Sequence, residues 1–107
     1  MTEADARLLQ IAVLIRDKRL QELALAAAAC AETRARLADL GRHGGSDALS
    51  PWETAMVLER HDQWLMQRRA ALNLHLSRQL VEWHQRYDSA RVAFGRADVL
   101  QECLTRR

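Results

Sequence analysis

Apolar and small residues recur every three or four positions between residues 3 and 40. This stretch contains neither glycine nor proline, so nothing in it interrupts a helix. The alternation of three and four is the heptad repeat of a helix that packs along another helix. We therefore predict a helix over residues 3–40, with a weak cap signal in Thr2 and Asp5. Its series comprises Ala6, Leu9, Val13, Leu20, Leu23, Ala27, Cys30 and Leu37, with Arg16 and Arg34 in two further places.

A second apolar series follows the only proline of the chain and predicts a helix over residues 51–105. In the segment SPWE, Ser50 can cap the helix, Pro51 fits the first helical position and Glu53 completes a capping box. Gly95 lies inside this helix and should weaken it by about 1 kcal/mol relative to alanine. Asp62 and Arg69 interrupt the series, which comprises Leu58, Leu65, Leu72, Leu76, Leu80, Trp83, Tyr87, Ala90, Phe94, Ala97 and Leu104.

Residues 41–50, GRHGGSDALS, hold three of the four glycines and separate the two helices. Gly41 suits the position after a helix, where a left-handed conformation is favoured. The segment lacks the Lys-Ser/Thr pair with which a glycine-rich loop binds phosphate and magnesium. We therefore interpret it as the turn of a hairpin. The predicted fold is all-α: a single domain over residues 1–107, formed by an antiparallel two-helix coiled-coil hairpin with a longer second helix.

The predicted helices differ in length by roughly 25 Å, at about 1.5 Å per residue. A tight turn would place the N-terminus beside residue 88 and leave the end of the second helix without a partner helix. An unpaired apolar stripe is a candidate binding face, and self-association and fraying remain alternatives. The predicted partner-binding residues are Phe94, Ala97, Leu100 and Leu104.

Two shorter stretches of the first helix carry further expectations. Residues 8–15, LLQIAVLI, are apolar on nearly every side. A hairpin covers only one face of a helix, so we expect this stretch to contact something else as well. Residues 22–32, ELALAAAACAE, contain small side chains that let two helices approach closely. In such a hairpin Arg34 would lie near Asp62, and we hypothesise an ion pair between them that fixes the register.

No residue pattern points to catalysis, a metal or a cofactor. The four histidines form no HExxH or ExxH pair, so neither a zinc protease nor a di-iron bundle is indicated. Cys30 lies on the apolar series, as a small core residue would, and Cys103 lies near the end of the chain. Without a CxxC pair, both are expected to be reduced thiols. We predict a protein that is not an enzyme.

The charge pattern favours no nucleic-acid partner. The net charge is +2, and the arginine-rich segment RHDQWLMQRR, residues 60–69, places Trp64 at the edge of the apolar series. No apolar run reaches the roughly 18 residues of a membrane span. The acidic first residues do not resemble a secretory leader. A cytoplasmic protein is the expectation.

The order of these features is distinctive. An Ala/Leu/Arg-rich helix leads into a turn that contains glycine and serine, a tryptophan opens a longer helix, and the end of the chain is basic. The residues concerned are Trp52, Leu72, Leu76, Leu80, Trp83, Arg106 and Arg107. Over nearly its whole length the chain thereby resembles the FliJ/YscO family of type III export stalk proteins.

The resemblance implies a cytoplasmic antiparallel coiled coil similar to the central stalk of a rotary ATPase. Such a protein inserts into the ring of the export ATPase, contacts the export gate protein and helps to handle substrate chaperones. It reaches the membrane only through these partners, in flagellum biogenesis or a related secretion system. The resemblance assigns no individual functional residue. The alternative is a dimerising helical-bundle protein that binds a ligand or a metal between its helices.

Overall fold

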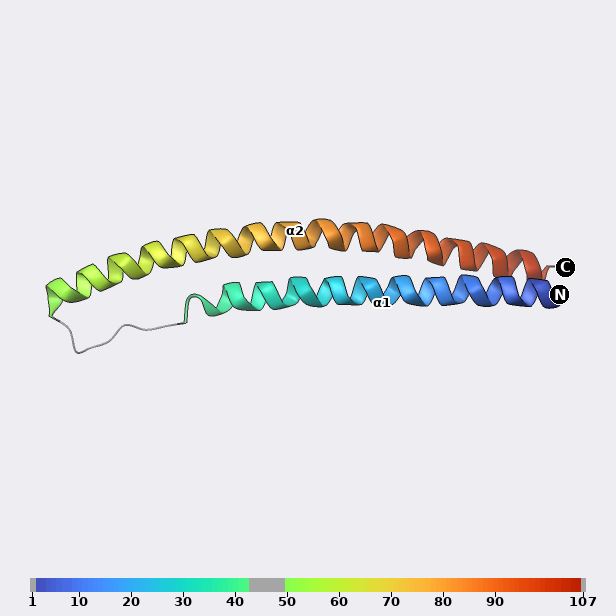
Figure 1. The fold of residues 1–107 in the computed structure, drawn as a ribbon, viewed down its shortest axis with the longest axis horizontal. Helices are drawn as coiled ribbons and strands as arrows, with labels where there is room; N and C mark the ends of the chain where they lie inside the picture. Colours follow the sequence, from blue (N-terminus) through green and yellow to red (C-terminus); the bar gives the residue numbers. More distant parts are fainter. Residues whose placement is uncertain (1, 43–49, 107) are drawn as a thin grey trace. The chain divides into compact units, whose positions relative to one another are not determined.

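The computed structural model describes residues 2–42 and 50–106, and over these residues the chain forms two α-helices and no strand. Helix α1 spans Glu3–Asp39 and has 37 residues, and α2 spans Pro51–Thr105 and has 55 residues (Figure 1). The predicted all-α class with a longer second helix is confirmed. Helix α1 ends one residue before the predicted boundary. Most of the predicted turn, residues 43–49, lies outside the described residues.

Both helices begin with a reciprocal capping box. The backbone N–H of Glu53 donates to the Ser50 hydroxyl, and the backbone N–H of Ser50 donates to the Glu53 carboxylate, each at 3.2 Å. Thr2 and Asp5 exchange the same two bonds at 3.2 and 3.1 Å. Each box provides partners for backbone N–H groups that the first turn of a helix cannot satisfy. The predicted SPWE start of α2 is therefore confirmed.

The end of α1 differs from the prediction. Gly41 was expected in the left-handed conformation, but no described glycine has a positive φ. Instead, the backbone N–H of Arg42 donates to the carbonyl oxygen of Asp39 at 3.1 Å. This tight turn satisfies one of the last carbonyl groups of the helix without a left-handed residue.

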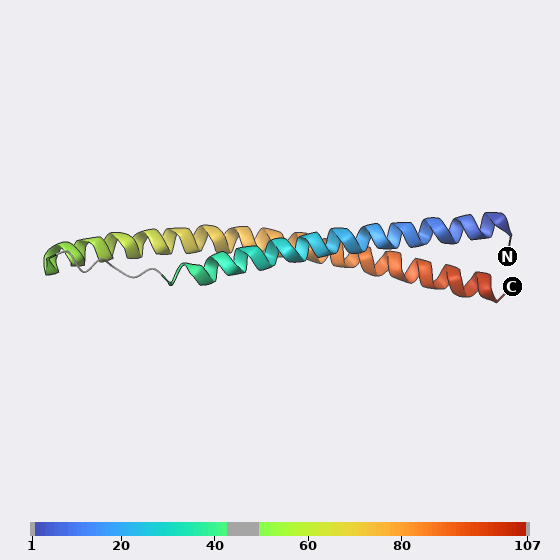
Figure 2. The same cartoon turned by 90° about the horizontal axis from the view of Figure 1, so that it is seen from below.

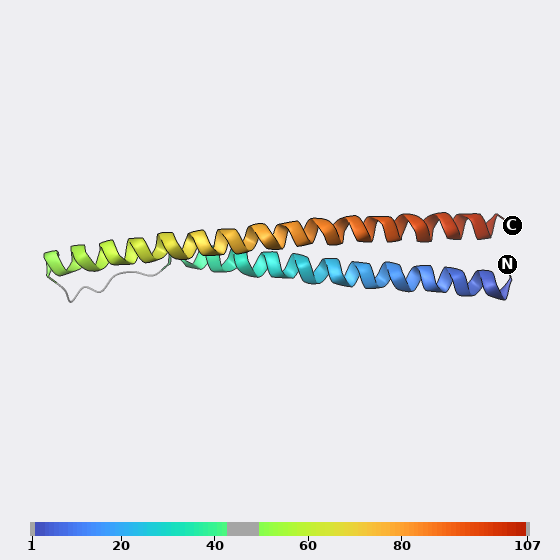
Figure 3. The same ribbon diagram turned by 45° about the horizontal axis from the view of Figure 1, so that its top comes forward.

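The helices pair in two compact units. Unit 1 comprises Met1–Ala28 and Leu80–Arg107, and unit 2 comprises Ala29–Gln79. In unit 1, the N-terminal stretch of α1 lies beside the C-terminal stretch of α2 and runs in the opposite direction (Figures 1 and 2). In unit 2, the end of α1 lies beside α2, again antiparallel (Figure 3). The predicted antiparallel pairing is thus present in each unit.

Small residues of α2 form the contact face of unit 1. Ala90, Ala93 and Ala97 are buried at intervals of three and four, and Leu104 extends this face. Alanine side chains let the helix axes approach closely, so the helices can pack without large interlocking side chains. The α1 residues Leu9, Val13 and Leu23 of the predicted apolar series are half-buried, whereas Ala6, Leu20 and Ala27 of that series are exposed.

Unit 2 has a core of mixed polarity. Cys30, Leu40 and Leu72 are buried together with Thr33. The Thr33 hydroxyl donates to the side-chain oxygen of Gln79 on α2 at 2.6 Å, and the carbonyl oxygen of Ala29 lies 3.2 Å away. Thr33 therefore occupies the contact position that the sequence pattern assigned to Arg34, which is exposed.

A stabilising substitution is available in the middle of α2. A Cβ atom added at Gly95 would meet nothing within 4 Å, and Gly95 has no positive φ. Gly95→Ala should therefore stabilise the fold by about 1 kcal/mol, through helix propensity and a less flexible unfolded chain. This gain corresponds to a rise of about 4–8 °C in the thermal midpoint, measured by circular dichroism. Gly41→Ala is the matched control, because Gly41 also has space for a Cβ but lies outside the helices. A Gly95→Ala midpoint no higher than the control's would contradict the prediction.

Candidate protein-binding surfaces

The register of unit 2 leaves the start of α2 without a stretch of α1 beside it. Leu40 and Leu72 line one hollow, so the end of α1 lies level with this part of α2. The first turns of α2, from Pro51 onward, extend past that end, as Figure 1 shows, whereas Trp64 lines the same hollow as Leu40. The 21 positions between Pro51 and Leu72 correspond to about 30 Å of helix. The stretch of α2 without α1 beside it is therefore at its beginning.

The prediction of an unpaired C-terminal stretch is wrong. Ala97 is 2% exposed and Leu104 is 6% exposed, because both lie against α1 in unit 1. The prediction assumed a tight turn, but the connection between Leu40 and Pro51 can reach about 35 Å when extended. That reach exceeds the roughly 27 Å by which α2 is longer than α1. The shorter helix can therefore bury its contact face along the far part of α2.

Phe94 and Leu100 keep part of their surface exposed, but they belong to different sides of unit 1. The guanidinium carbon of Arg16 lies 5.4 Å above the centre of the Phe94 ring, a cation–π contact between the two helices. Leu100 is half-buried and lines a groove that does not include Phe94. The four predicted residues therefore do not form one surface to which a partner could bind. Contact of Phe94 or Leu100 with another protein stays a prediction.

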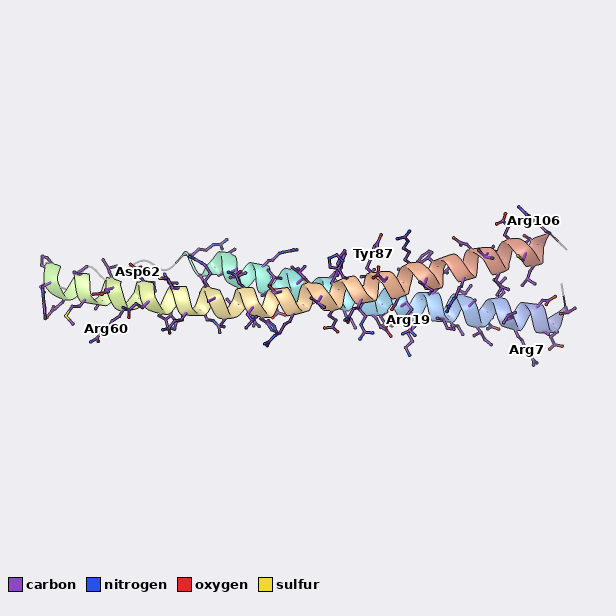
Figure 4. All side chains as sticks on the ribbon, turned by 90° about the horizontal axis from the view of Figure 1, so that it is seen from above. Arg7, Arg19, Arg60, Asp62, Tyr87 and Arg106 are labelled. Carbon is purple, nitrogen blue, oxygen red and sulfur yellow. The ribbon has the colours of Figure 1, made fainter. Side chains whose placement is uncertain are left out.

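Two exposed tryptophans mark the first part of α2, Trp52 past the end of α1 and Trp64 beside that end. Trp52 is 72% exposed and Trp64 is 50% exposed, and the imidazole of His61 stacks on Trp64 with ring centres 5.9 Å apart. Met56, Val57 and Leu58 add further exposed apolar surface between them. Figure 4 shows Arg60 and Asp62 on opposite sides of the same stretch. Tryptophan is a residue type that contributes strongly at protein interfaces, so we define Trp52–Trp64 as the tryptophan segment.

A second surface lies in unit 1, where side chains of α1 and α2 line a groove. Leu8 and Ile15 of α1 and Val92 and Val99 of α2 are large apolar residues that remain exposed there. Smaller residues between them, Ala12, Ala93 and Gly95, leave the groove hollow. The exposed Leu8, Ile11, Leu14 and Ile15 agree with the expectation that a hairpin cannot cover residues 8–15 on every side. We call this surface the valine groove.

The opposite side of unit 1 is aromatic. Trp83 stacks on Tyr87 with ring centres 5.5 Å apart, and Phe94 follows two turns later. Figure 4 shows Tyr87 and Arg19 on opposite sides of the helix pair. Arg19 lines the valine groove, so the aromatic side and the groove are separate surfaces.

A shared carboxylate links the two helices of unit 1. The Glu22 carboxylate accepts hydrogen bonds from Arg19 of the same helix at 3.1 Å and from Arg86 of α2 at 3.2 Å. Arg86 also lies 3.7 Å from the Glu82 carboxylate. The Glu22 side chain is only 23% exposed, so it is better shielded than an ordinary surface ion pair.

The Glu22→Gln variant should lower the free energy of unfolding by about 1 kcal/mol at low salt. The neutral amide removes the negative charge that Arg19 and Arg86 share, and leaves Arg86 with the more distant Glu82 carboxylate alone. Urea denaturation at low ionic strength and in 1 M NaCl measures the effect, which should shrink at high salt. Glu3→Gln is the control, because the Glu3–Arg7 pair is mostly exposed. Equal effects of the two substitutions would show that the Glu22 cluster contributes no more to the free energy of unfolding than an exposed ion pair does.

The hypothesised Arg34–Asp62 ion pair is absent. Both residues are exposed, and neither takes part in an ion pair within residues 2–42 and 50–106. Thr33 contacts Gln79 of α2. The neighbouring Arg34 therefore lies about 24 Å along α2 from Asp62, beside which the hypothesis placed it. Between described residues, Thr33–Gln79 in unit 2 and Glu22–Arg86 in unit 1 are polar contacts that do join the helices.

The described part of the chain shows no constellation for metal binding. No group of three or more His, Cys, Asp or Glu side chains lies close enough there to hold a metal ion. Cys30 is buried and Cys103 exposed, and both are free thiols. Neither helix, over its described residues, is both long and apolar enough to cross a membrane.

The tryptophan segment and the valine groove are thus two surfaces on which large apolar side chains remain exposed. The tryptophan segment belongs to unit 2 and the valine groove to unit 1. Sequence reasoning identified Trp52 as the opening of α2 and Trp64 as the edge of its apolar series, but the register that exposes them could not be obtained from spacing alone. Comparison with family models, with curated proteins and with solved structures gives no match for this chain.

Proposed function

We propose that the protein is a non-enzymatic helical scaffold that binds another protein through the tryptophan segment. The observation that carries this proposal is the start of α2, which continues past the end of α1 with Trp52 exposed and has Trp64 exposed beside that end. A helix with an uncovered apolar face is a common recognition element, because a groove in a partner can bury that face. Burial of an aromatic side chain of this size contributes much of the affinity of a typical interface.

We further propose that the partner is the ATPase of a type III export system, with the scaffold as its stalk. The resemblance to the FliJ/YscO family supports this partner, and the antiparallel pairing of α1 and α2 is compatible with such a stalk. The protein would then act in the cytoplasm, with the export gate protein as a second partner and the membrane reached only through both. The role would be in flagellum biogenesis or a related type III secretion system.

The test is a titration of the full chain against the export ATPase of the same organism, with binding and ATP turnover as readouts. The double variant Trp52→Ala/Trp64→Ala should lower the affinity at least tenfold, the effect expected when tryptophan anchors are truncated. Val81→Ala is the control, because Val81 is an exposed apolar residue of α2 outside the tryptophan segment. Circular dichroism should show unchanged helicity for both variants, since the substituted side chains are exposed.

The outcomes test the identity of the partner and the location of the binding surface separately. Absence of binding by the unmodified chain would overturn the export ATPase as the partner. Binding that the double variant retains in full would overturn the tryptophan segment as the binding surface. Removal of residues 90–107 is not a suitable test, because it would delete Ala90, Ala93, Ala97 and Leu104 from the contact face of unit 1.

A further inference from the structure

The valine groove contains one acidic and one basic side chain that form no ion pair with described residues of the same chain. Asp88 and Arg96 line the groove and are exposed, and neither takes part in an ion pair within the described residues. Eight residues separate them along α2, which is about 12 Å, so they cannot pair with each other. Val92 lies midway between them and is 51% exposed. The groove thus presents a negative and a positive group at equal distances from one apolar side chain.

This arrangement is complementary to itself under a two-fold rotation. A two-fold axis beside Val92 and perpendicular to α2 reverses the direction of the helix in a second copy. A residue four positions before Val92 then faces the residue four positions after it in the other copy. Asp88 would meet Arg96 of the second copy, and Arg96 would meet Asp88 of the second copy. An interface in which the same patch contacts itself is the usual form of a symmetric dimer.

The small residues of α2 fit the same rotation. Ser89 lies three positions before Val92 and Gly95 lies three positions after it, so the two would face each other across the axis. A glycine inside a helix costs about 1 kcal/mol, and no neighbouring atom in this chain requires one at residue 95. A second helix packed on this face can approach closely at Gly95, so the gain expected of Gly95→Ala applies at concentrations where the chain is monomeric.

We propose that a second copy of this chain packs on α2 in the antiparallel direction, with a two-fold axis beside Val92. Two Asp88–Arg96 ion pairs between the copies fix the register, and Val92 and Val99 provide the apolar contact. Another protein helix could enter an apolar groove of this kind, but the mirrored charges match this chain's own sequence. The dimer goes beyond the proposed scaffold function, because it uses unit 1 and leaves the tryptophan segment of unit 2 outside the interface.

Sedimentation equilibrium of the full chain tests the dimer through a charge exchange. The unmodified chain should reach twice its monomer mass as the concentration rises. Asp88→Arg and Arg96→Asp should each lower the dimerisation constant at least tenfold, because each replaces two attractive contacts with two repulsive ones. The double variant Asp88→Arg/Arg96→Asp should return to within about threefold of the original constant, because both ion pairs re-form with reversed signs.

Matched controls separate the interface from the change in net charge. Asp98→Arg and Arg91→Asp make the same charge changes at exposed positions of α2 that do not line the groove, and they should leave the dimer unchanged. Oxidation of Val92→Cys in a Cys103→Ser background should give a covalent dimer, whereas Asp98→Cys in that background should not. The Trp52→Ala/Trp64→Ala variant should also dimerise normally, so failure of the dimer and failure of the scaffold function are distinguishable.

Three results would overturn the proposal. The first is a chain that stays monomeric at every concentration. The second is a dimer that neither single charge reversal weakens. The third is a double variant that remains as weak as the single variants, because the two residues would then not face each other.

Discussion

Replacing Ala97 with leucine should lower the free energy of unfolding by about 2–3 kcal/mol. Ala97 is 2% exposed in unit 1, where its small side chain lies between α1 and α2. Three additional carbon atoms cannot be accommodated there unless the helices separate. Separation would also loosen the neighbouring contacts at Ala93 and Leu104. Urea denaturation followed by circular dichroism measures the change, and a chain that is unfolded without urea would be the extreme form of the same result.

Ala24→Leu is the matched control for this substitution. Ala24 lies in the same unit but is exposed, so the same added atoms meet solvent. Its effect should stay within about 0.5 kcal/mol. An Ala97→Leu variant as stable as Ala24→Leu would show that α1 and α2 do not approach closely at Ala97.

Truncating Leu72 to alanine should lower the free energy of unfolding by about 3 kcal/mol. Leu72 is 5% exposed and is the buried α2 residue beside the end of α1 in unit 2. Removing its side chain takes apolar contact from Leu40 and leaves a space that two helices cannot fully close. The midpoint of urea denaturation should fall, with a slope close to that of the unmodified chain.

Leu74→Ala makes the same chemical change two residues away, at a side chain that is 55% exposed. Little apolar area is lost there, so its effect should stay within about 0.5 kcal/mol. Equal effects of Leu72→Ala and Leu74→Ala would contradict the register that places Leu72 beside Leu40.

The sequence predicts the helices far better than it predicts their register. Absence of glycine and proline defines α1, and the SPWE capping box marks the start of α2. The predicted contact face of α1 is also nearly correct, since the buried residue is Thr33, one position from the expected Arg34. That shift is small because a helix with 3.6 residues per turn drifts relative to a strict heptad.

Register depends on contacts that no local pattern contains. The Glu22–Arg86 and Thr33–Gln79 contacts join residues 64 and 46 positions apart. Alanine-rich faces can slide along each other with little change in packing, so such polar contacts help to choose one alignment. The assumed tight turn chose another alignment and moved the expected unpaired stretch from the start of α2 to its end. The tryptophan segment therefore becomes apparent only when the helices are placed side by side.

The two cysteines give the protein a built-in chemical reporter of local unfolding. Cys30 is buried in unit 2, whereas Cys103 is exposed in unit 1. A thiol-specific reagent should therefore modify Cys103 at once and Cys30 only when the helices of unit 2 separate. The rate of the slow reaction gives the free energy of that opening, as hydrogen exchange does for backbone amides. Alkylation kinetics read by mass spectrometry would thus show whether the unit that carries the exposed tryptophans opens on its own, without any engineered label.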